Sequence, residues 1–156
     1  MSDITPTLKR KIFIKDIEIA VKQHPRAVDG NSPLLPLKHT FADGVYVRDL
    51  TIPKNSLVVG KIHKHKTVNI LLKGEITVLT EDGVKRLKAP MYFTAPAGSK
   101  KVGFTHEDTV WLNIHPTKET DLVKIEEEVI TKQSFIDVEI EENKILELAK
   151  ESVWVG

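Results

Sequence analysis

Between residues 45 and 115 the chain is a succession of short β-like runs separated by turn residues. The runs cover Val45–Ile52, Leu57–His65, Val68–Lys73, Glu75–Thr80, Val84–Leu87, Met91–Thr94, Lys101–Thr105 and Val110–His115. Among the turns, Asp82-Gly83 is the strongest signal, because a two-residue hairpin needs the positive φ that Asp-Gly adopts at little cost. Short strands at such close spacing are typical of a sandwich or barrel. We therefore predict a mainly β fold with one barrel over residues 39–116.

The two flanking zones differ from this core. Residues 1–38 combine a mixed stretch at 9–23 with later prolines and a glycine, which predicts an N-terminal arm with room for a short helix. After the barrel, Leu122, Ile125 and Val129 recur at helical spacing behind Thr120, which predicts a helix of about three turns. Residues 134–140 alternate weakly and residues 141–150 read as a final helix. We therefore expect residues 117–156 to form an α-rich C-terminal extension.

The C-terminal zone also suggests self-association. It ends in the apolar residues Val153, Trp154 and Val155, and a helix that exposes such residues usually docks on its own barrel or on another subunit. From residue 118 onward 11 acidic residues face 5 basic ones, whereas 18 basic and 11 acidic residues precede them. This opposite charge predicts that the tail lies against a barrel, and we favour a homo-oligomer, a dimer or larger.

Composition narrows the function classes. With 156 residues the chain has room for one main core, and a formal net charge of +1 predicts no direct binding to nucleic acid. The absence of cysteine removes disulfides, thiolate catalysis and thiolate metal sites. No apolar run approaches the roughly 18 residues of a membrane span, and the N-terminus lacks the pattern of a signal peptide. We expect a cytoplasmic protein without a membrane partner.

His63 and His65 are the first candidate site residues. Two histidines two positions apart on one strand point to the same face and can chelate one metal ion. Neutral imidazole suits Zn, Fe, Ni, Cu or Mn. The alternative is that both histidines lie on a solvated face among the neighbouring lysines.

This segment also carries a family resemblance. The His63-x-His65 pair opening a strand, the apolar run that ends in Gly74-Glu75, and Pro96-x-Gly98 before another strand pair together resemble the two motifs of the cupin superfamily, over about residues 44–116. The resemblance implies a double-stranded β-barrel of jelly-roll type with a ligand site inside. The KIHKHKTVNILLKGE segment is also similar to cupin-like proteins encoded by tailed bacteriophages, which would place the protein in the host cytoplasm.

The chain departs from the metal-binding pattern that the resemblance implies. Metal-bearing cupins have a glutamate after the histidine pair and a third histidine after Pro-x-Gly, whereas this chain has Thr67 and Lys101 there. Asn69 shares the parity of the two histidines if the strand runs on without a bulge. His115, on the last barrel strand, would complete a His63/His65/His115 site for one divalent transition metal (Zn, Fe, Mn or Ni), or else it packs at the barrel rim.

These exchanges lead to the predicted function. Replacing glutamate by Thr67 and histidine by Lys101 removes a negative charge and adds a positive one, which suits a bound anion. We therefore predict a cupin that holds a nucleotide, sugar phosphate or carboxylate near His63, His65, Thr67, Asn69 and Lys101, with Arg48, Lys85, Arg86 and Lys100 adding positive charge. In a phage, such a protein would sequester a host metabolite or signal.

Two other function classes stay open at this point. One is a metal-dependent cupin enzyme of the isomerase or dioxygenase type that uses His63 and His65. The other is a structural or assembly protein of a phage, which would fit the apolar C-terminus. The sequence does not decide whether the protein is catalytic.

Overall fold

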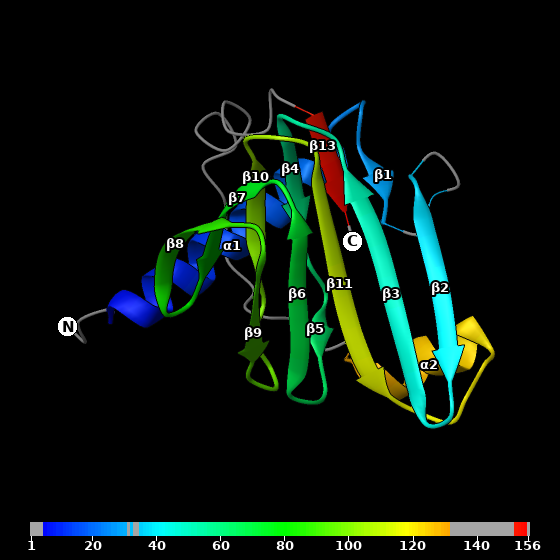
Figure 1. The fold of residues 1–156 in the computed structure, drawn as a ribbon. Coiled ribbons are helices and arrows are strands. Elements are labelled where there is room, and N and C mark those ends of the chain that lie inside the picture. Colours follow the sequence, from blue (N-terminus) through cyan, green and yellow to red (C-terminus); the bar gives the residue numbers. More distant parts are fainter. Residues whose placement is uncertain (1–4, 31, 33–34, 132–151, 156) are drawn as a thin grey trace.

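The computed structural model describes residues 5–30, 32, 35–131 and 152–155 and consists mainly of antiparallel strands (Figure 1). The strands are β1 (Val28–Asp29), β2 (Leu37–Ala42), β3 (Val45–Ile52), β4 (Ser56–Val59), β5 (Ile62–His63), β6 (Thr67–Lys73), β7 (Glu75–Thr80), β8 (Gly83–Lys88), β9 (Met91–Ala95), β10 (Val102–Thr105), β11 (Thr109–Pro116), β12 (Ile130–Thr131) and β13 (Ser152–Val155). The helices are α1 (Pro6–Gln23) and α2 (Leu122–Val129).

Two sheets build the barrel. One has the strand order β2-β3-β11-β6-β9 and the other the order β1-β13-β4-β10-β7-β8, while β12 and β5 form a separate pair. In Figure 1 the five-stranded sheet lies in front of the six-stranded one. Apolar side chains of both sheets, such as Leu50, Leu71, Ile76 and Trp111, pack together between them. The predicted mainly β, jelly-roll architecture is confirmed.

Helix α1 is longer than the short helix expected within the arm. It runs for 18 residues, and the Thr5 hydroxyl caps its start by accepting a hydrogen bond from the Leu8 amide. Its buried residues Ile14, Ile17 and Val21 follow helical spacing and pack on the outer face of the six-stranded sheet. Lysines between these positions interrupt the apolar pattern. The sequence pattern alone therefore does not predict the full length of the helix, which is stabilised by its packing on the sheet.

Helix α2 is shorter than the predicted three turns, with 8 residues, and it lies across one end of the barrel (Figure 1). Asp121, not Thr120, is the N-cap, and its carboxylate accepts hydrogen bonds from the amides of Val123 and Lys124. Ile125 and Val129 pack on Tyr46. The helix thus closes the barrel end from which the side chain of Tyr46 points inward.

The Asp121 cap gives a first test of how firmly α2 is held. We expect Asp121→Ala to lower the free energy of unfolding by about 1 kcal/mol, because two backbone amides lose their acceptor. In a protein of this size that corresponds to a fall in Tm of about 2–4 °C in thermal unfolding. Asp121→Asn is the control, since asparagine also caps helices and should retain most of the wild-type Tm. Equal losses in both variants would contradict the capping role.

The C-terminal residues join the barrel as a strand. Val153, Trp154 and Val155 belong to β13, which pairs in parallel with β4 on one side and with β1 on the other. The apolar chain end expected to close a helix therefore lies in the sheet of its own barrel. The run predicted at 134–140 and the helix predicted at 141–150 lie outside the described residues. The homo-oligomer remains a prediction.

Candidate ligand-binding cavity

A cavity of about 380 Å³ lies between the two sheets and extends to α2. Its volume is within the range of roughly 300–1,000 Å³ that small-molecule sites occupy. Its polar lining residues are His39, Tyr46, Arg48, Lys61, His63, Lys101, Asn113, His115 and Glu126. The inner apolar residues are Leu37, Leu50, Ile52, Val58, Ile76, Val78 and Trp111, and α2 adds further apolar side chains.

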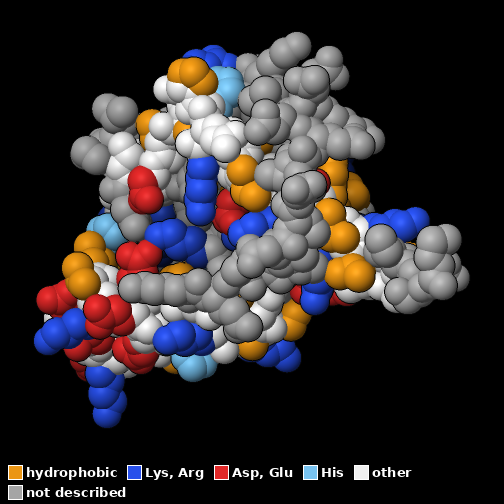
Figure 2. All heavy atoms as spheres, turned by 180° about the vertical axis from the view of Figure 1, so that it is seen from behind, with side chains coloured by type: hydrophobic (Ala, Val, Ile, Leu, Met, Phe, Trp, Pro, Cys, Tyr) orange, Lys and Arg blue, Asp and Glu red, His pale blue; other side chains and the backbone are white. Residues whose placement is uncertain are grey.

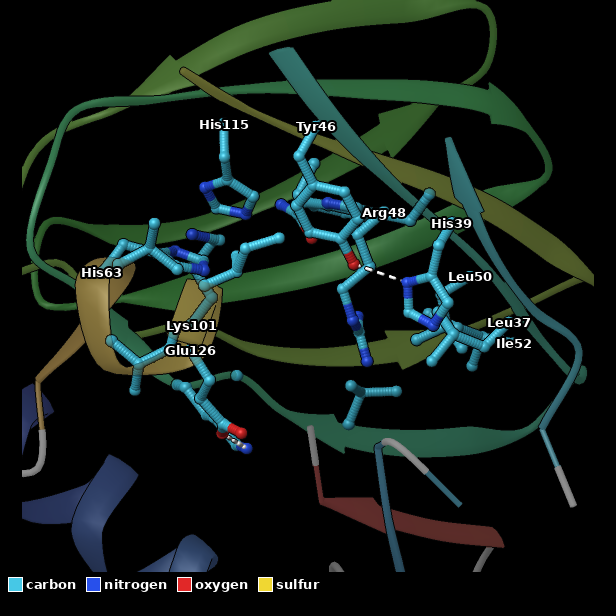
Figure 3. Close-up of a pocket in the computed structure, with 18 of the residues that line it drawn as sticks. Leu37, His39, Tyr46, Arg48, Leu50, Ile52, His63, Lys101, His115 and Glu126 are labelled. Atoms are coloured by element: carbon cyan, nitrogen blue, oxygen red, sulfur yellow. Dashed lines mark hydrogen bonds and ion pairs between the residues drawn. The ribbon is translucent and has the colours of Figure 1, made fainter. Parts of the chain in front are cut away.

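Strand register sorts these side chains by depth. Alternate residues of a strand face the same side, so neighbouring strands form rungs of inward-facing side chains. The rung nearest α2 pairs Tyr46 with His115, the next joins His39, Arg48 and Asn113, and the third joins Leu37, Leu50 and Trp111. Figure 3 shows the same order, with His63, Lys101 and Glu126 on one side of Arg48 and the leucines on the other. The lining of the cavity therefore changes from polar next to α2 to apolar at the opposite end.

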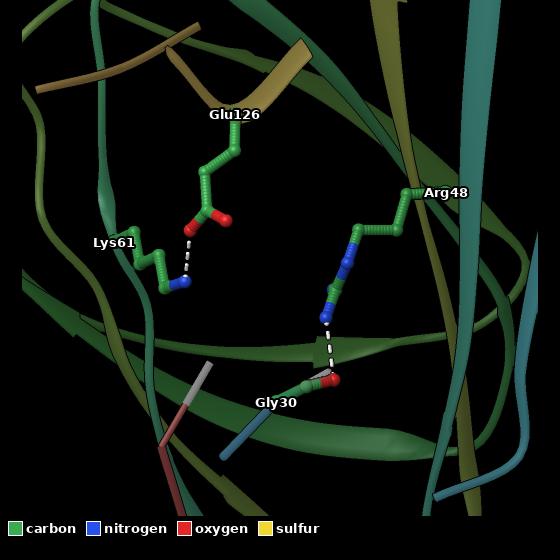
Figure 4. A network of polar contacts seen from close by, with 4 residues as sticks. All are labelled: Gly30, Arg48, Lys61 and Glu126. Atoms are coloured by element: carbon green, nitrogen blue, oxygen red, sulfur yellow. Dashed lines mark hydrogen bonds and ion pairs between the residues drawn. The ribbon is translucent and has the colours of Figure 1, made fainter. Parts of the chain in front are cut away.

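Three cationic side chains and one carboxylate line the polar end. Lys61 forms an ion pair with Glu126 on α2, and the Arg48 Nη2 donates a hydrogen bond to the Gly30 carbonyl at 2.8 Å (Figure 4). Lys101 makes no hydrogen bond or ion pair with another described residue. Seen from behind, Lys and Arg side chains gather beside a few carboxylates near the middle of the face in Figure 2. Arg48 and Lys101 thus line the cavity without forming an ion pair with another described residue.

The positive charges of Arg48 and Lys101 destabilise the folded protein. Burial lowers the pKa of the Arg48 guanidinium, although the charges of Tyr46, Asp29 and Glu126 raise it. Burial also lowers the pKa of the Lys101 ammonium, and only the more distant Glu81 opposes that effect. Both shifts show that the protein interior disfavours these charges. An anion that entered the cavity would supply the missing counter-charge.

The histidines of the cavity are neutral near pH 7. Burial, followed by the charge of Lys101, lowers the pKa of His63 to about 3. Burial, followed by the charge of Arg48, lowers the pKa of His115 to about 4. The two imidazole rings lie 5.1 Å apart between centroids. His39 shares a hydrogen bond of 2.6 Å between its Nδ1 and the Tyr46 hydroxyl. These rings therefore offer hydrogen bonds and stacking surfaces rather than charge.

The structure separates His65 from His63. The predicted strand over 57–65 breaks after β4 at Gly60, whose amide donates to the Lys101 carbonyl at 2.8 Å. A second strand, β5, ends at His63 and pairs with β12. The expectation that His63 and His65 share one strand face is wrong, because the chain bends at residues 64–65 and leaves His65 exposed.

The other predicted site residues fall into two groups. His63, Lys101 and His115 line the cavity. Thr67 and Asn69 are buried but do not line it. The Asn69 side-chain oxygen accepts hydrogen bonds from Trp111 and Asn113, so this residue holds two cavity walls in place.

The basic residues named from the sequence also divide. Arg48 lines the cavity, whereas Lys100 is buried in an ion pair with Glu18 of α1. Arg86 lies on the exposed part of β8 and bonds Glu75. Sequence reasoning missed Lys61 and Glu126, because the strand break and the position of α2 bring them together. The alternation of Tyr46, Arg48, Leu50 and Ile52 on β3 was the available signal for the cavity wall.

A conventional metal site does not fit the described residues. Metal-bearing cupins use three or four His and Glu ligands by the resemblance, but no group of three such side chains in the described part of the chain is placed to hold a metal ion. His63 and His115 face each other, and the cation of Lys101 faces the same space. An ammonium beside the two imidazoles repels a metal cation.

Solved structures with a similar fold are cupins. KdgF from Halomonas sp. matches at 15% identity with a TM-score of 0.50, over 59% of this chain and 88% of that one. An RmlC-like cupin from Shewanella frigidimarina matches at 16% identity with a TM-score of 0.48, over 60% and 84%. The cupin domain of Schizosaccharomyces pombe Cnp3 matches at 18% identity with a TM-score of 0.47, over 62% and 72%.

No protein-family model and no curated protein matches the chain. The predicted likeness to cupins is confirmed at the level of the fold, and the chain has the cupin fold. The resemblance to phage-encoded proteins stays a prediction. Of the helices in the described ranges, neither is long and apolar enough to cross a bilayer.

Proposed function

We propose that the protein binds a small organic anion in the barrel cavity, with Arg48 and Lys101 as its charged contacts. The observation that carries the proposal is the excess of positive charge inside a cavity of about 380 Å³. Glu126 forms an ion pair with Lys61, whereas Arg48 and Lys101 form no ion pair with another described residue, although Asp29 and Glu126 act on Arg48 electrostatically. Buried charges are normally paired, so an unpaired pair of cations around a cavity favours an anionic ligand.

The site differs in its members from the one predicted from sequence. Lys101 and His63 keep their proposed places beside the ligand. Arg48 replaces His65 as a contact, and Asn113 replaces Asn69, because Asn69 lies beside Asn113 in the same sheet and accepts its hydrogen bond without lining the cavity. An arginine fork suits a carboxylate or phosphate better than an exposed imidazole does.

Metal-dependent chemistry at His63 and His115 is the alternative that the cupin fold suggests. The distance between the two rings supports it, and the neighbouring cations oppose it. Elemental analysis of protein purified without chelator separates the two functions. About one transition metal per chain that disappears in a His63→Ala/His115→Ala variant would replace the anion proposal by a metal site.

Thermal unfolding with added anions tests the proposal. A ligand that binds only the folded state raises the free energy of unfolding with the logarithm of its concentration over Kd, by about 2.7 kcal/mol at 100 times Kd. We expect at least one compound in a panel of organic carboxylates, sugar phosphates and nucleotides to raise the Tm of the wild type. Arg48→Gln should abolish that rise.

Arg86→Gln is the matched control, because Arg86 is exposed on β8 and does not line the cavity. It should retain the full rise in Tm. A panel without any rise, or an equal loss in both arginine variants, would refute anion binding in the cavity.

A further inference from the structure

Among the described residues, the side chains that line the end of the cavity away from α2 are apolar. Six residues from both sheets line it: Leu37, Leu50, Ile52, Val58, Ile76 and Val78. The indole of Trp111 also reaches it, but its N–H already donates to Asn69 at 3.1 Å. A hydroxyl group placed at this end would exchange its hydrogen bonds to water for contacts with methyl groups, which is unfavourable.

Gly103 makes room for an apolar side chain at this end. It lies on β10 between Val58 of β4 and Val78 of β7. A Cβ added there would lie 2.7 Å from the Ile76 Cδ1, so the glycine allows Ile76 to pack over this part of the sheet. A larger residue at this position would displace Ile76, which itself lines the cavity.

Charge and apolar surface occupy opposite ends of one cavity. Arg48 lies on the rung directly beside the one that holds Leu50, since both residues face inward on β3. Its guanidinium donates to the Gly30 carbonyl, and Lys101 lines the same cavity on the side of His63 and Glu126 (Figure 3). A molecule with an acid group at the cations therefore directs the rest of its body to the leucines and valines.

We propose that the ligand is an amphiphilic organic acid, whose anionic head contacts Arg48 and Lys101 and whose hydrocarbon body fills the inner end of the barrel. This inference rests on the proposed function and narrows it. Sugar acids, sugar phosphates and nucleotides carry hydroxyl or ring-nitrogen groups over most of their surface, so they do not match the apolar end. Short alkyl or aryl carboxylates do.

Hexanoate and gluconate make a matched test, because both are six-carbon monocarboxylates and they differ in their hydroxyl groups. We expect isothermal titration calorimetry to give at least a tenfold lower Kd for hexanoate than for gluconate. Along the series acetate, butanoate and hexanoate, each methylene should lower Kd by about fourfold until the cavity is full. Hexanamide, which lacks the charge, should bind more weakly than hexanoate.

Gly103→Val tests the apolar end separately from the head group. It should reduce the ratio of hexanoate affinity to acetate affinity, because the new side chain displaces Ile76, one of the residues that line the apolar end. If that variant does not fold, the wild-type series still decides the question.

The outcomes separate the two proposals. Gluconate or a sugar phosphate binding as tightly as hexanoate would overturn the amphiphilic ligand and leave anion binding intact. Hexanamide binding as well as hexanoate, or no binding by any of these compounds and inorganic phosphate, would overturn both.

Discussion

Lys101→Met should stabilise the ligand-free protein and weaken anion binding strongly. The ammonium of Lys101 lies inside the barrel without a hydrogen bond or ion pair to another described residue, and burial lowers its pKa. A group whose folded-state pKa is lowered in this way destabilises the fold at every pH at which it carries its charge. Methionine has a similar length and no charge, so it fills the same space without that cost.

The expected gain is about 1–2 kcal/mol in the free energy of unfolding, since apolar replacements of buried charges are often stabilising by this amount or more. In a protein of this size it corresponds to a rise in Tm of about 2–8 °C. The same change should weaken binding of a carboxylate or phosphate at least about 30-fold, because removing one partner of a buried charge pair costs about 2–5 kcal/mol. Calorimetry with the best ligand and thermal unfolding without it measure the two effects.

Lys85→Met is the matched control. Lys85 is exposed on β8, outside the cavity, so its replacement should change neither Tm nor affinity appreciably. A gain in stability together with a loss of affinity in Lys101→Met would identify Lys101 as a functional residue. Residues that serve binding often lower the stability of the folded protein. A Lys101→Met variant that is less stable than the wild type, or that binds as tightly, would contradict this assignment.

Local sequence pattern was sufficient for most of the barrel. The runs Val45–Ile52 and Glu75–Thr80 coincide with β3 and β7, because their alternation and their turns are set by neighbouring residues. Helix α1 was underestimated, since its apolar stripe is interrupted by lysines. Strand β13 was read as part of a helical extension, because its pairing with β4 joins residues almost a hundred positions apart.

The cavity was predicted only in part for a similar reason. Lys101 and His63 could be recognised from the cupin resemblance, as residues at the motif positions. The position of Arg48 in the cavity could not be predicted from its own segment. It depends on the pairing of β3 with β2 and β11, which places Arg48 beside His39 and Asn113. His65 was misplaced because β5 ends at His63. The bend at residues 64–65 breaks the two-residue alternation on which the prediction depended. Contacts between distant segments therefore define this site more than any motif does.

The unliganded protein should lose stability steeply between pH 7 and pH 5. The pKa values of His63 and His115 are about 3 and about 4 in the folded protein. Both lie below 6.5, the ordinary pKa of a histidine side chain, which applies to the unfolded chain. The unfolded chain therefore binds more protons than the folded one in this range, so the free energy of unfolding falls as the pH is lowered. The stability is fully present above pH 6.5 and is lost progressively toward the folded-state pKa values.

Two largely buried histidines of this kind should together reduce the free energy of unfolding by about 2–4 kcal/mol at pH 5, relative to pH 7. The groups that face them are cations on several elements: Arg48 on β3, Lys61 before β5 and Lys101 before β10, with Glu126 of α2 paired to Lys61. Protonated imidazoles would add to this positive charge. Denaturant unfolding at a series of pH values measures the loss.

The double variant His63→Gln/His115→Gln should flatten this pH dependence, because glutamine does not titrate. His24→Gln provides a control, since His24 lies at the C-terminal end of α1 and away from the cavity. A wild-type curve that is flat between pH 5 and pH 7, or one that stays equally steep in the double variant, would contradict the placement of these histidines. An anion in the cavity favours the protonated imidazoles and raises their pKa. A saturating organic acid should therefore reduce the acid sensitivity of the wild type and leave that of the double variant unchanged.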